Sequence, residues 1–182
     1  MKSCISVLFT AFFLLRFVEY SFEMMGPHLL QRNSPGAFQI FVQLPHLVAI
    51  SDSNNDTIME CLTIERTELN LKDQTASYVF LFRGHHGTEK KNVTFFITPG
   101  PTPETFEFNT DEDPSLKDIS TIPYWNRKNC FVADGPYHGG EQCMLLVSKG
   151  TEDDVPRECI EQFEDICGVA VINYSRDLCP DV

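Results

Sequence analysis

Basic residues are scarce in this chain of 182 residues, which holds 14 Lys and Arg against 26 Asp and Glu. The formal net charge of −12 opposes binding to nucleic acid and to anionic membrane surfaces, because both are themselves negatively charged. Tryptophan is scarcer still, with a single residue beside 15 Phe, and this composition indicates an interior filled mainly by Phe rings. We therefore predict no nucleic-acid partner and no membrane partner.

The motifs of common hydrolases and metal sites are also missing. The sequence holds no G-x-S-x-G, no H-E-x-x-H and no pair of cysteines in a C-x₂-C arrangement. The closely spaced histidines, His85 and His86, are adjacent and lie in a glycine-containing turn, where we expect them to be solvated. The sequence therefore predicts a protein that is not an enzyme and that needs no metal ion and no cofactor.

Long apolar runs are missing except at the amino terminus. Lys2 supplies a positive charge, and residues 4–15 then form an apolar segment that is too short to span a bilayer. This pattern predicts a secretory signal peptide over residues 1–21, with cleavage near Ser21, rather than a first core helix. The remaining residues, 22–182, have the length of one domain, and we expect the protein to be secreted.

Six cysteines remain once the predicted signal peptide is removed, because Cys4 is one of the seven in the chain. An even number of cysteines in an exported protein indicates three disulfides, which would leave no thiolate as a nucleophile. Six cysteines can pair in many ways, so their spacing alone does not choose the pairs. The six are Cys61, Cys130, Cys143, Cys159, Cys167 and Cys179.

Three Asn-x-Ser/Thr sequons, at Asn55, Asn92 and Asn173, agree with export and are candidate glycosylation sites. A motif this short also arises by chance, so each sequon carries little weight alone. Asn92 and Asn173 fall within or beside apolar runs, where a glycan fits less easily than at Asn55.

Short β-prone segments follow one another from about His46 to Val147, at a spacing of about ten residues and with turn signals between them. This spacing indicates an all-β protein, either an antiparallel sandwich or a barrel, and periodicity does not choose between the two. The expected strands cover residues 46–50, 57–66, 77–82, 92–97, 105–108, 119–124, 129–133 and 142–147, with a last short strand at 169–172.

One segment, Val155–Cys167, has a clear helical pattern. Apolar residues recur along it at helical spacing, two Asp residues before it offer an amino-terminal cap, Pro156 is tolerated in the first turn, and Gly168 suits the carboxyl-terminal cap. The apolar stripe must pack on another element, most simply on the outer wall of a barrel. A second segment, 37–44, fits either a short helix or a strand and is ended by Pro45.

Several features of the last third of the sequence occur together in one known family. An aromatic-rich strand, Ile122–Trp125, runs into Cys130, and a proline precedes the helix that Cys159 opens. Further toward the amino terminus, Cys61 matches a cysteine that the same family carries in an early strand. In these respects the sequence resembles the salivary lipocalins of ticks, the histamine-binding protein family. The resemblance implies an eight-stranded antiparallel lipocalin barrel, with the carboxyl-terminal helix packed outside it and a small host mediator bound inside.

The same resemblance implies the disulfide pairs Cys61–Cys179, Cys130–Cys159 and Cys143–Cys167. Two of these bridges would tether the helix to neighbouring strands at either end. The third would hold the tail of the chain against the early strand.

Two positions depart from the amine-binding members of that family. Those members carry an acidic residue directly after the cysteine that Cys130 matches, and a Glu-Leu-Trp-like triplet in the next strand. This sequence has Phe131 at the first position and Met144-Leu145-Leu146 at the second. Burying an ammonium group without a counter-charge costs on the order of several kcal/mol. Family membership favours a biogenic amine such as histamine or serotonin, whereas these substitutions favour a lipid-like ligand.

The candidate lining residues are aromatic and apolar side chains that can share an inward face of the barrel. An amine would in addition need Glu60 or Glu107 facing inward, because aromatic rings contribute only about 0.5–2 kcal/mol toward a cation. The alternative is that both glutamates point outward as solvated charges. The lining candidates are Tyr78, Phe80, Phe82, Phe106, Phe108, Phe131, Met144 and Leu146.

A second function also fits this scaffold: an inhibitor that binds host complement or a protease through loops on the same barrel. A cavity lined by side chains would favour the sequestration of a small mediator, which would blunt host inflammatory defence. A filled interior with an apolar outer patch would favour protein binding. In either case we expect a monomer.

Overall fold

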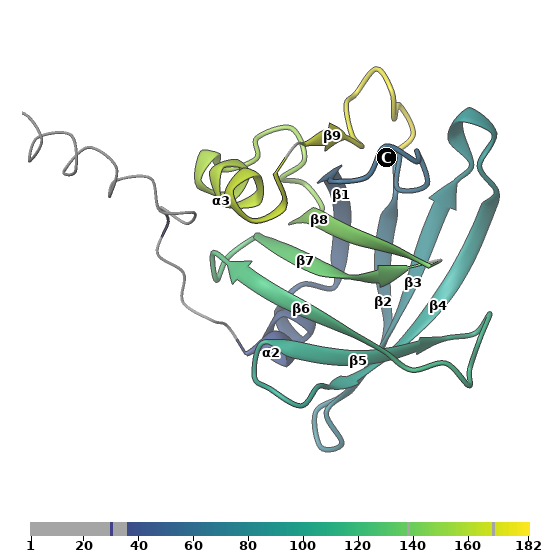
Figure 1. Cartoon of the computed structure of the whole chain (residues 1–182), viewed down its shortest axis with the longest axis vertical. Helices are drawn as coiled ribbons and strands as arrows, with labels where there is room; N and C mark the ends of the chain where they lie inside the picture. Colours follow the sequence, from purple (N-terminus) through teal and green to yellow (C-terminus); the bar gives the residue numbers. More distant parts are fainter. Residues whose placement is uncertain (1–29, 31–35, 138, 169) are drawn as a thin grey trace, which may run out of the picture. The chain divides into compact units, whose positions relative to one another are not determined.

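Eight strands run antiparallel to their neighbours and close into a barrel in the computed structural model, which describes residues 30, 36–137, 139–168 and 170–182 (Figure 1). They pair in chain order, and β1 closes the ring because it pairs with both β2 and β8. The predicted barrel is therefore confirmed, while the predicted signal peptide, residues 1–21, lies outside the described residues. The strands are β1 (His46–Asp52), β2 (Thr63–Asn70), β3 (Thr75–Arg83), β4 (Lys90–Pro99), β5 (Thr105–Thr110), β6 (Asp118–Trp125), β7 (Cys130–Tyr137) and β8 (Gly140–Ser148).

Alternation along the strands sorts side chains between the inside and the outside of the barrel. In β4, Val93, Phe95 and Ile97 are buried, whereas Asn92 and Phe96 are exposed. Successive side chains of a strand point to opposite faces, so one row of each strand faces inward. These inward rows together form the main apolar core, which fills much of the barrel interior.

A short helix, α2 (Ala37–Gln43), closes the end of the barrel at which β1 begins (Figure 1). It contacts β4, β5 and β6, and its residues Ile40 and Phe41 are buried in the interior core. The backbone N–H of Ala37 donates to the carbonyl of Pro103 in the loop between β4 and β5, at 2.7 Å. Of the two structures that the sequence allowed for this segment, the helix is therefore the one formed.

Residues 53–62 form a loop at the opposite end of the barrel. The predicted strand 57–66 is wrong in its first half, because β2 begins only at Thr63. Thr57 and Cys61 have φ angles of 63° and 56°, which lie outside the β region and interrupt a strand. The Cys61 N–H donates to the Asn173 carbonyl at 2.9 Å, so the loop is bound to the tail of the chain instead of to a sheet neighbour.

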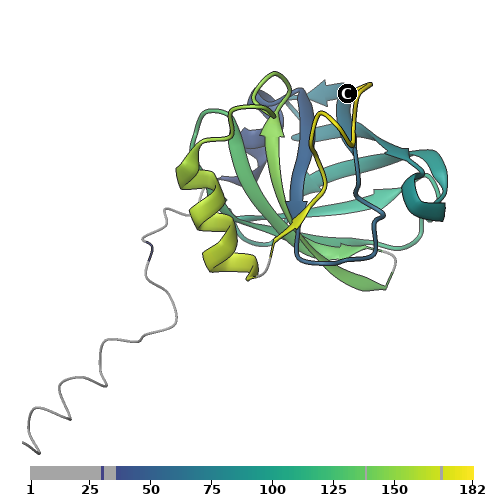
Figure 2. The same ribbon diagram turned by 90° about the horizontal axis from the view of Figure 1, so that it is seen from above.

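The helix α3 (Arg157–Cys167) packs on the outer wall of the barrel, against β7 and β8 (Figures 1 and 2). Cys159 is buried there in a second apolar cluster, together with outward-facing residues of both strands. The helix begins two residues later than predicted, because Pro156 is its N-cap and the Asp153 carboxylate binds Arg176 instead of capping it. No helix in the described part of the chain is long and apolar enough to cross a membrane.

Three disulfides hold this outer layer together. They join Cys61 to Cys179, Cys130 to Cys159 and Cys143 to Cys167, with Cα atoms 5.5, 6.3 and 5.7 Å apart. These are the pairs that the resemblance implies, and their Cα separations lie in the usual range for disulfides. Two bridges attach α3 to β7 and β8. The third attaches the tail, which follows the short strand β9 (Val171–Ile172), to the loop 53–62.

Candidate ligand-binding site

A cavity of about 60 Å³ lies inside the barrel. The structure places Phe82 behind the cavity wall, where its ring stacks on that of Tyr137 with centroids 5.6 Å apart. The other apolar candidates all lie on the wall, together with residues from α2, β1, β2 and β4, so the lining is almost entirely apolar. The candidates on the wall are Tyr78, Phe80, Phe106, Phe108, Phe131, Met144 and Leu146, and their neighbours include Phe41, Leu47, Ile64, Phe95 and Ile97.

Strand register explains how β7 and β8 contribute to the wall. Phe131 pairs with Leu146 and Ala133 pairs with Met144, and all four residues line the cavity. Cys143, which directly precedes Met144 on β8, points outward and is bonded to α3. Because side chains alternate with a period of two, this disulfide also fixes which row of β8 faces the cavity.

Aromatic rings form a continuous series of contacts through the interior, from α2 to β7. Phe41 contacts Tyr78 and Phe106 edge-on, with centroids 5.7 and 5.0 Å away. Such pairs stabilise the interior beyond the burial of their area, and they give the cavity flat aromatic walls. From Phe106 the series continues through Phe108, Phe95, Phe80 and Phe82 to Tyr137, with successive centroids between 3.9 and 6.3 Å apart.

The hydroxyl of Tyr78 is directed toward the helix α2. It lies 2.9 Å from the Phe41 carbonyl oxygen and 2.8 Å from that of Leu44, so it donates its proton at the carboxyl-terminal end of the helix. Arg66 also donates from Nη1 to the Phe41 carbonyl, at 2.6 Å. Burial raises the pKa of Tyr78 to about 12, against a smaller lowering by Arg66. The hydroxyl is thus a neutral donor that serves the helix at neutral pH.

Neither candidate glutamate lies on the cavity wall. Glu60 is on the loop 53–62, not on a strand as predicted, and its buried Oε2 lies 2.6 Å from Nδ1 of His86. His86 is therefore exposed but bound, which corrects the expectation that it is simply solvated. Glu107 pairs with the exposed Ile119 on β6, and it borders a separate hollow of about 350 Å³ at the strands β3 to β5.

Two further aspartates are desolvated: Asp134 borders the cavity, and Asp52 is not among the lining residues. Asp134 pairs with the outward Cys143, so its side chain belongs to the outer row. Desolvation raises the pKa of this carboxyl. Asp52, at the end of β1, is 1% exposed and accepts a hydrogen bond from the Asn54 N–H at 3.1 Å. Burial raises the pKa of Asp52 from 3.8 to about 6, although the neighbouring Asn173 side chain and the hydrogen bond from the Asn54 N–H oppose the shift.

Sequence reasoning missed two polar residues on the wall, Ser120 and Gln142. Alternation identifies Gln142, because it precedes the inward Met144 by two residues on β8. Ser120 precedes an irregularity in the pairing of β6 with β7, where alternation is a weaker guide. Both side chains are buried, at 7% and 2% exposure. They add a hydroxyl and an amide to a largely apolar lining.

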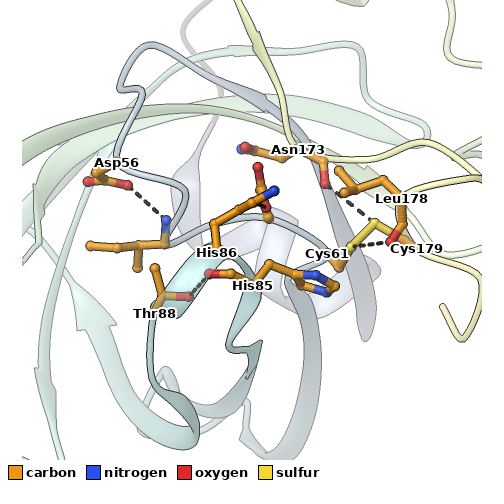
Figure 3. A network of polar contacts seen from close by, with 10 residues as sticks. Asp56, Cys61, His85, His86, Thr88, Asn173, Leu178 and Cys179 are labelled. Carbon is orange, nitrogen blue, oxygen red and sulfur yellow. Dashed lines mark hydrogen bonds and ion pairs between the residues drawn. A yellow bond between two sulfur atoms is a disulfide. The ribbon is translucent and has the colours of Figure 1, made fainter.

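The loop 53–62 covers the end of the cavity opposite α2, and its Met59 is buried and lines the cavity. Several contacts hold this loop in place. Among them are the disulfide of Cys61, a hydrogen bond of 2.9 Å from Gln142 Nε2 to Asp56 Oδ2, and the contact with His86. Figure 3 shows the loop, the turn that carries both histidines and the tail together around that disulfide.

The sequon at Asn173 does not fit the structure as a glycosylation site. Asn173 is 1% exposed and its Nδ2 atom is buried, so a glycan on that atom would have no space in the folded protein. Its carbonyl instead binds the Cys61 N–H. Asn55 and Asn92 are exposed, and a glycan at either position would extend into solvent.

Within the described residues, no group of three or more His, Cys, Asp or Glu side chains is placed to hold a metal ion. The cavity offers mainly aromatic surfaces and apolar side chains, with the Ser120 hydroxyl and the Gln142 amide among the few polar groups. This lining can hold a small molecule by dispersion contacts and by removal of apolar surface from water.

A closed up-and-down barrel of eight strands with an interior cavity is the architecture of the lipocalins, which share it with other small barrels. The chain belongs to the tick histamine binding protein family, whose sequence profile matches residues 46–179. The family resemblance seen in the sequence is thereby confirmed. No curated protein sequence matches the chain.

Two solved structures illustrate the likeness of the fold. The serotonin complex of AM182 gives a TM-score of 0.60 at 15% identity, over 83% of this chain and 99% of that one. Japanin from Rhipicephalus appendiculatus, bound to cholesterol, gives a TM-score of 0.53 at 14% identity, over 79% of this chain and 99% of that one. At these identities the likeness establishes the lipocalin fold and leaves the ligand of this chain open.

Proposed function

We propose that the protein is secreted and sequesters one small, largely apolar host mediator inside its barrel, which would blunt host inflammatory defence. One observation carries this proposal: Phe131 and Met144 face the cavity at the positions where amine-binding members of the family carry carboxylates. The family supports sequestration, and the lining favours a lipid-like ligand over an amine. The ligands of AM182 and japanin, serotonin and cholesterol, span both chemical classes.

The energetic argument against an amine follows from the charges around the cavity. Glu60 is occupied by His86, and Glu107 lies off the wall. An ammonium in this cavity would rely on aromatic faces, which supply about 0.5–2 kcal/mol each. Its desolvation costs on the order of several kcal/mol, so a lipid-like ligand without an ammonium group is favoured.

The cavity is small, and a ligand larger than a few atoms needs neighbouring side chains to move. Phe80 and Phe106 are only half-buried, and Met144 has a flexible, unbranched side chain. We expect these three residues to change rotamer when ligand enters. Loop 53–62, which covers one end, is the expected entry side, because α2 closes the other.

Several finer features belong to the same proposal. The disulfides agree with an oxidising, extracellular location, and glycans are proposed at Asn55 and Asn92 but not at Asn173. The protein acts as a binder and not as an enzyme, and one chain suffices because the cavity lies within one barrel. Glycopeptide mapping of secreted protein would show Asn173 unmodified; an occupied Asn173 would contradict the structure at the tail.

Blocking the cavity tests where the ligand binds. Ala133→Leu should extend a side chain into the cavity from β7, and it should weaken one-to-one binding of a leukotriene at least about tenfold, as measured by native mass spectrometry. Ala170→Leu, at an exposed position directly before β9, is the matched control and should leave binding unchanged. Equal leukotriene binding by both variants and the wild type would place the ligand outside the barrel.

Protein binding is the second candidate function, and an outer-wall feature favours it. Phe96 on β4 and Ile119 on β6 are 43% and 48% exposed on the outside of the barrel, with β5 between them. Assays of complement lysis and of protease inhibition test this reading. Inhibition that is lost in Phe96→Asp but kept in Ala133→Leu would favour the outer wall over the cavity.

A further inference from the structure

Gln142 has one fixed and one unused hydrogen-bonding atom. Its Nε2 donates to Asp56 Oδ2 at 2.9 Å, whereas its Oε1 is buried and has no hydrogen-bond partner among the described residues. Asp56 also accepts hydrogen bonds from Asn54 Nδ2 at 2.8 Å and from the Ile58 N–H at 2.9 Å, so its own position is fixed. A buried amide oxygen without a donor is unusual, since most buried polar atoms are paired.

The orientation of this amide follows from its partner. An ionised carboxylate only accepts hydrogen bonds, so the atom of Gln142 that faces Asp56 must be the NH₂ group. Rotating the amide by 180° would bring two acceptors together. The free atom is therefore the carbonyl oxygen, which can only accept a hydrogen bond.

Ser120 and Gln142 flank Gly135 on the two strands that neighbour β7. Gly135 pairs with Gln142, and a Cβ atom at Gly135 would lie 1.9 Å from Ser120 Oγ, so the serine hydroxyl occupies the space that a side chain on β7 would fill. Ser120, Gly135 and Gln142 all line the cavity. The acceptor of Gln142 and a hydroxyl that can donate or accept are thus together at one place on the apolar wall.

The geometry points to an apolar ligand that carries one hydroxyl group, bound with that hydroxyl at Ser120 and Gln142. The ligand hydroxyl donates to Gln142 Oε1 and accepts from Ser120, whereas an ether oxygen could not donate and an ammonium could not accept. The rings of the aromatic series contact the apolar remainder of the ligand. This inference rests on the proposed function and deepens it by naming the ligand class.

A matched pair of fluorescent probes tests it at neutral pH. 2-Naphthol carries the hydroxyl, and 2-methoxynaphthalene replaces its proton by a methyl group while keeping the aromatic body. We expect the wild-type protein to bind 2-naphthol about tenfold more tightly, the difference that one hydrogen bond to a buried acceptor produces. Gln142→Met should bring the ratio of the two dissociation constants close to one, and Gln162→Met, at a buried glutamine on α3, should leave it unchanged.

The outcomes separate this inference from the function on which it rests. Equal binding of the two probes by the wild-type protein would overturn the hydroxyl assignment and leave apolar sequestration intact. A preference that persists in Gln142→Met would also overturn it. Binding of neither probe would overturn the proposed function and this inference together. If Gln142→Met does not fold, the wild-type ratio and Ser120→Ala, for which a smaller loss of preference is expected, decide the case.

Discussion

Tyr78 contributes both to the cavity wall and to the end of α2. Its ring lines the cavity, and its hydroxyl lies within 2.9 Å of two carbonyl oxygens at the end of α2. The terminal carbonyls of a helix have no partner within the helix, so a buried donor at this point stabilises it. Arg66 shares one of these carbonyls, which leaves the Leu44 oxygen most dependent on Tyr78.

Tyr78→Phe should therefore destabilise the protein by about 1–3 kcal/mol, since a buried acceptor loses its donor while the ring remains. Urea unfolding with the disulfides intact measures the change. Tyr124→Phe, at a half-buried tyrosine on the outer face, is the control and should cost less. Equal losses in the two variants would show that the hydroxyl of Tyr78 does not support α2.

Asp52 gives the protein a pH dependence of definite sign. Its pKa is raised by burial from 3.8 to about 6, so the folded state holds the proton more tightly than the unfolded state does. Its contribution to stability is greatest below about pH 4 and is lost as the pH rises through about 6, by up to about 3 kcal/mol. Asp52→Asn removes this dependence and should be more stable than the wild type at pH 7.5.

The difference in unfolding free energy between Asp52→Asn and the wild type isolates this group. Exposed carboxylates with lowered pKa values, such as Asp113 and Asp153, act in the opposite direction, but they cancel in the comparison. The difference should grow between pH 4 and 6 and level off above. A difference that is constant over this range would contradict the burial of an ionisable Asp52.

At the residue scale, alternation predicted part of the site. Tyr78 and Phe80, two residues apart, both line the cavity, and so do Phe106 and Phe108. The position of Glu60 could not be predicted, because it depends on a loop whose path is set by a disulfide and by His86. Alternation does not predict the direction of a single side chain where the backbone departs from a regular strand.

At the element scale, the three disulfides should contribute unequally. Cys61–Cys179 spans 118 residues and Cys143–Cys167 spans 24. The chain-entropy model gives about 5 kcal/mol for the longer span and about 3.5 kcal/mol for the shorter. Replacing each pair by Ala and measuring urea unfolding compares the two bridges. A larger loss on removing the shorter bridge would show that native packing, not loop closure, determines their contributions.

The elements themselves were predictable to the extent that their signals are local. The helix α3 was visible from its apolar stripe and from Gly168, which has a φ of 81° at the C-cap. Its first residue was missed, since the Asp153 carboxylate that could have capped it is bound to Arg176, 23 residues further along the chain. The strand predicted through Cys61 failed for a similar reason, because its partner is in the tail.

At the scale of the whole molecule, barrel closure depends on the pairing of β1 with both β2 and β8. The pairing of β1 with β8 joins residues about 100 positions apart, as Val48 with Val147 shows. Strand periodicity contains no information on it, which is why the sequence pattern left sandwich and barrel open. The family resemblance chose between them, and the same resemblance implied the disulfide pairs.

The central claim, that the barrel holds a lipid-like ligand rather than an amine, is tested most directly by titrating the purified protein with a leukotriene, histamine and serotonin in a calorimeter. We predict one-to-one binding of the leukotriene and much weaker binding of both amines, with no change in Glu60→Gln or Glu107→Gln. Tight histamine binding that survives both substitutions would contradict the account.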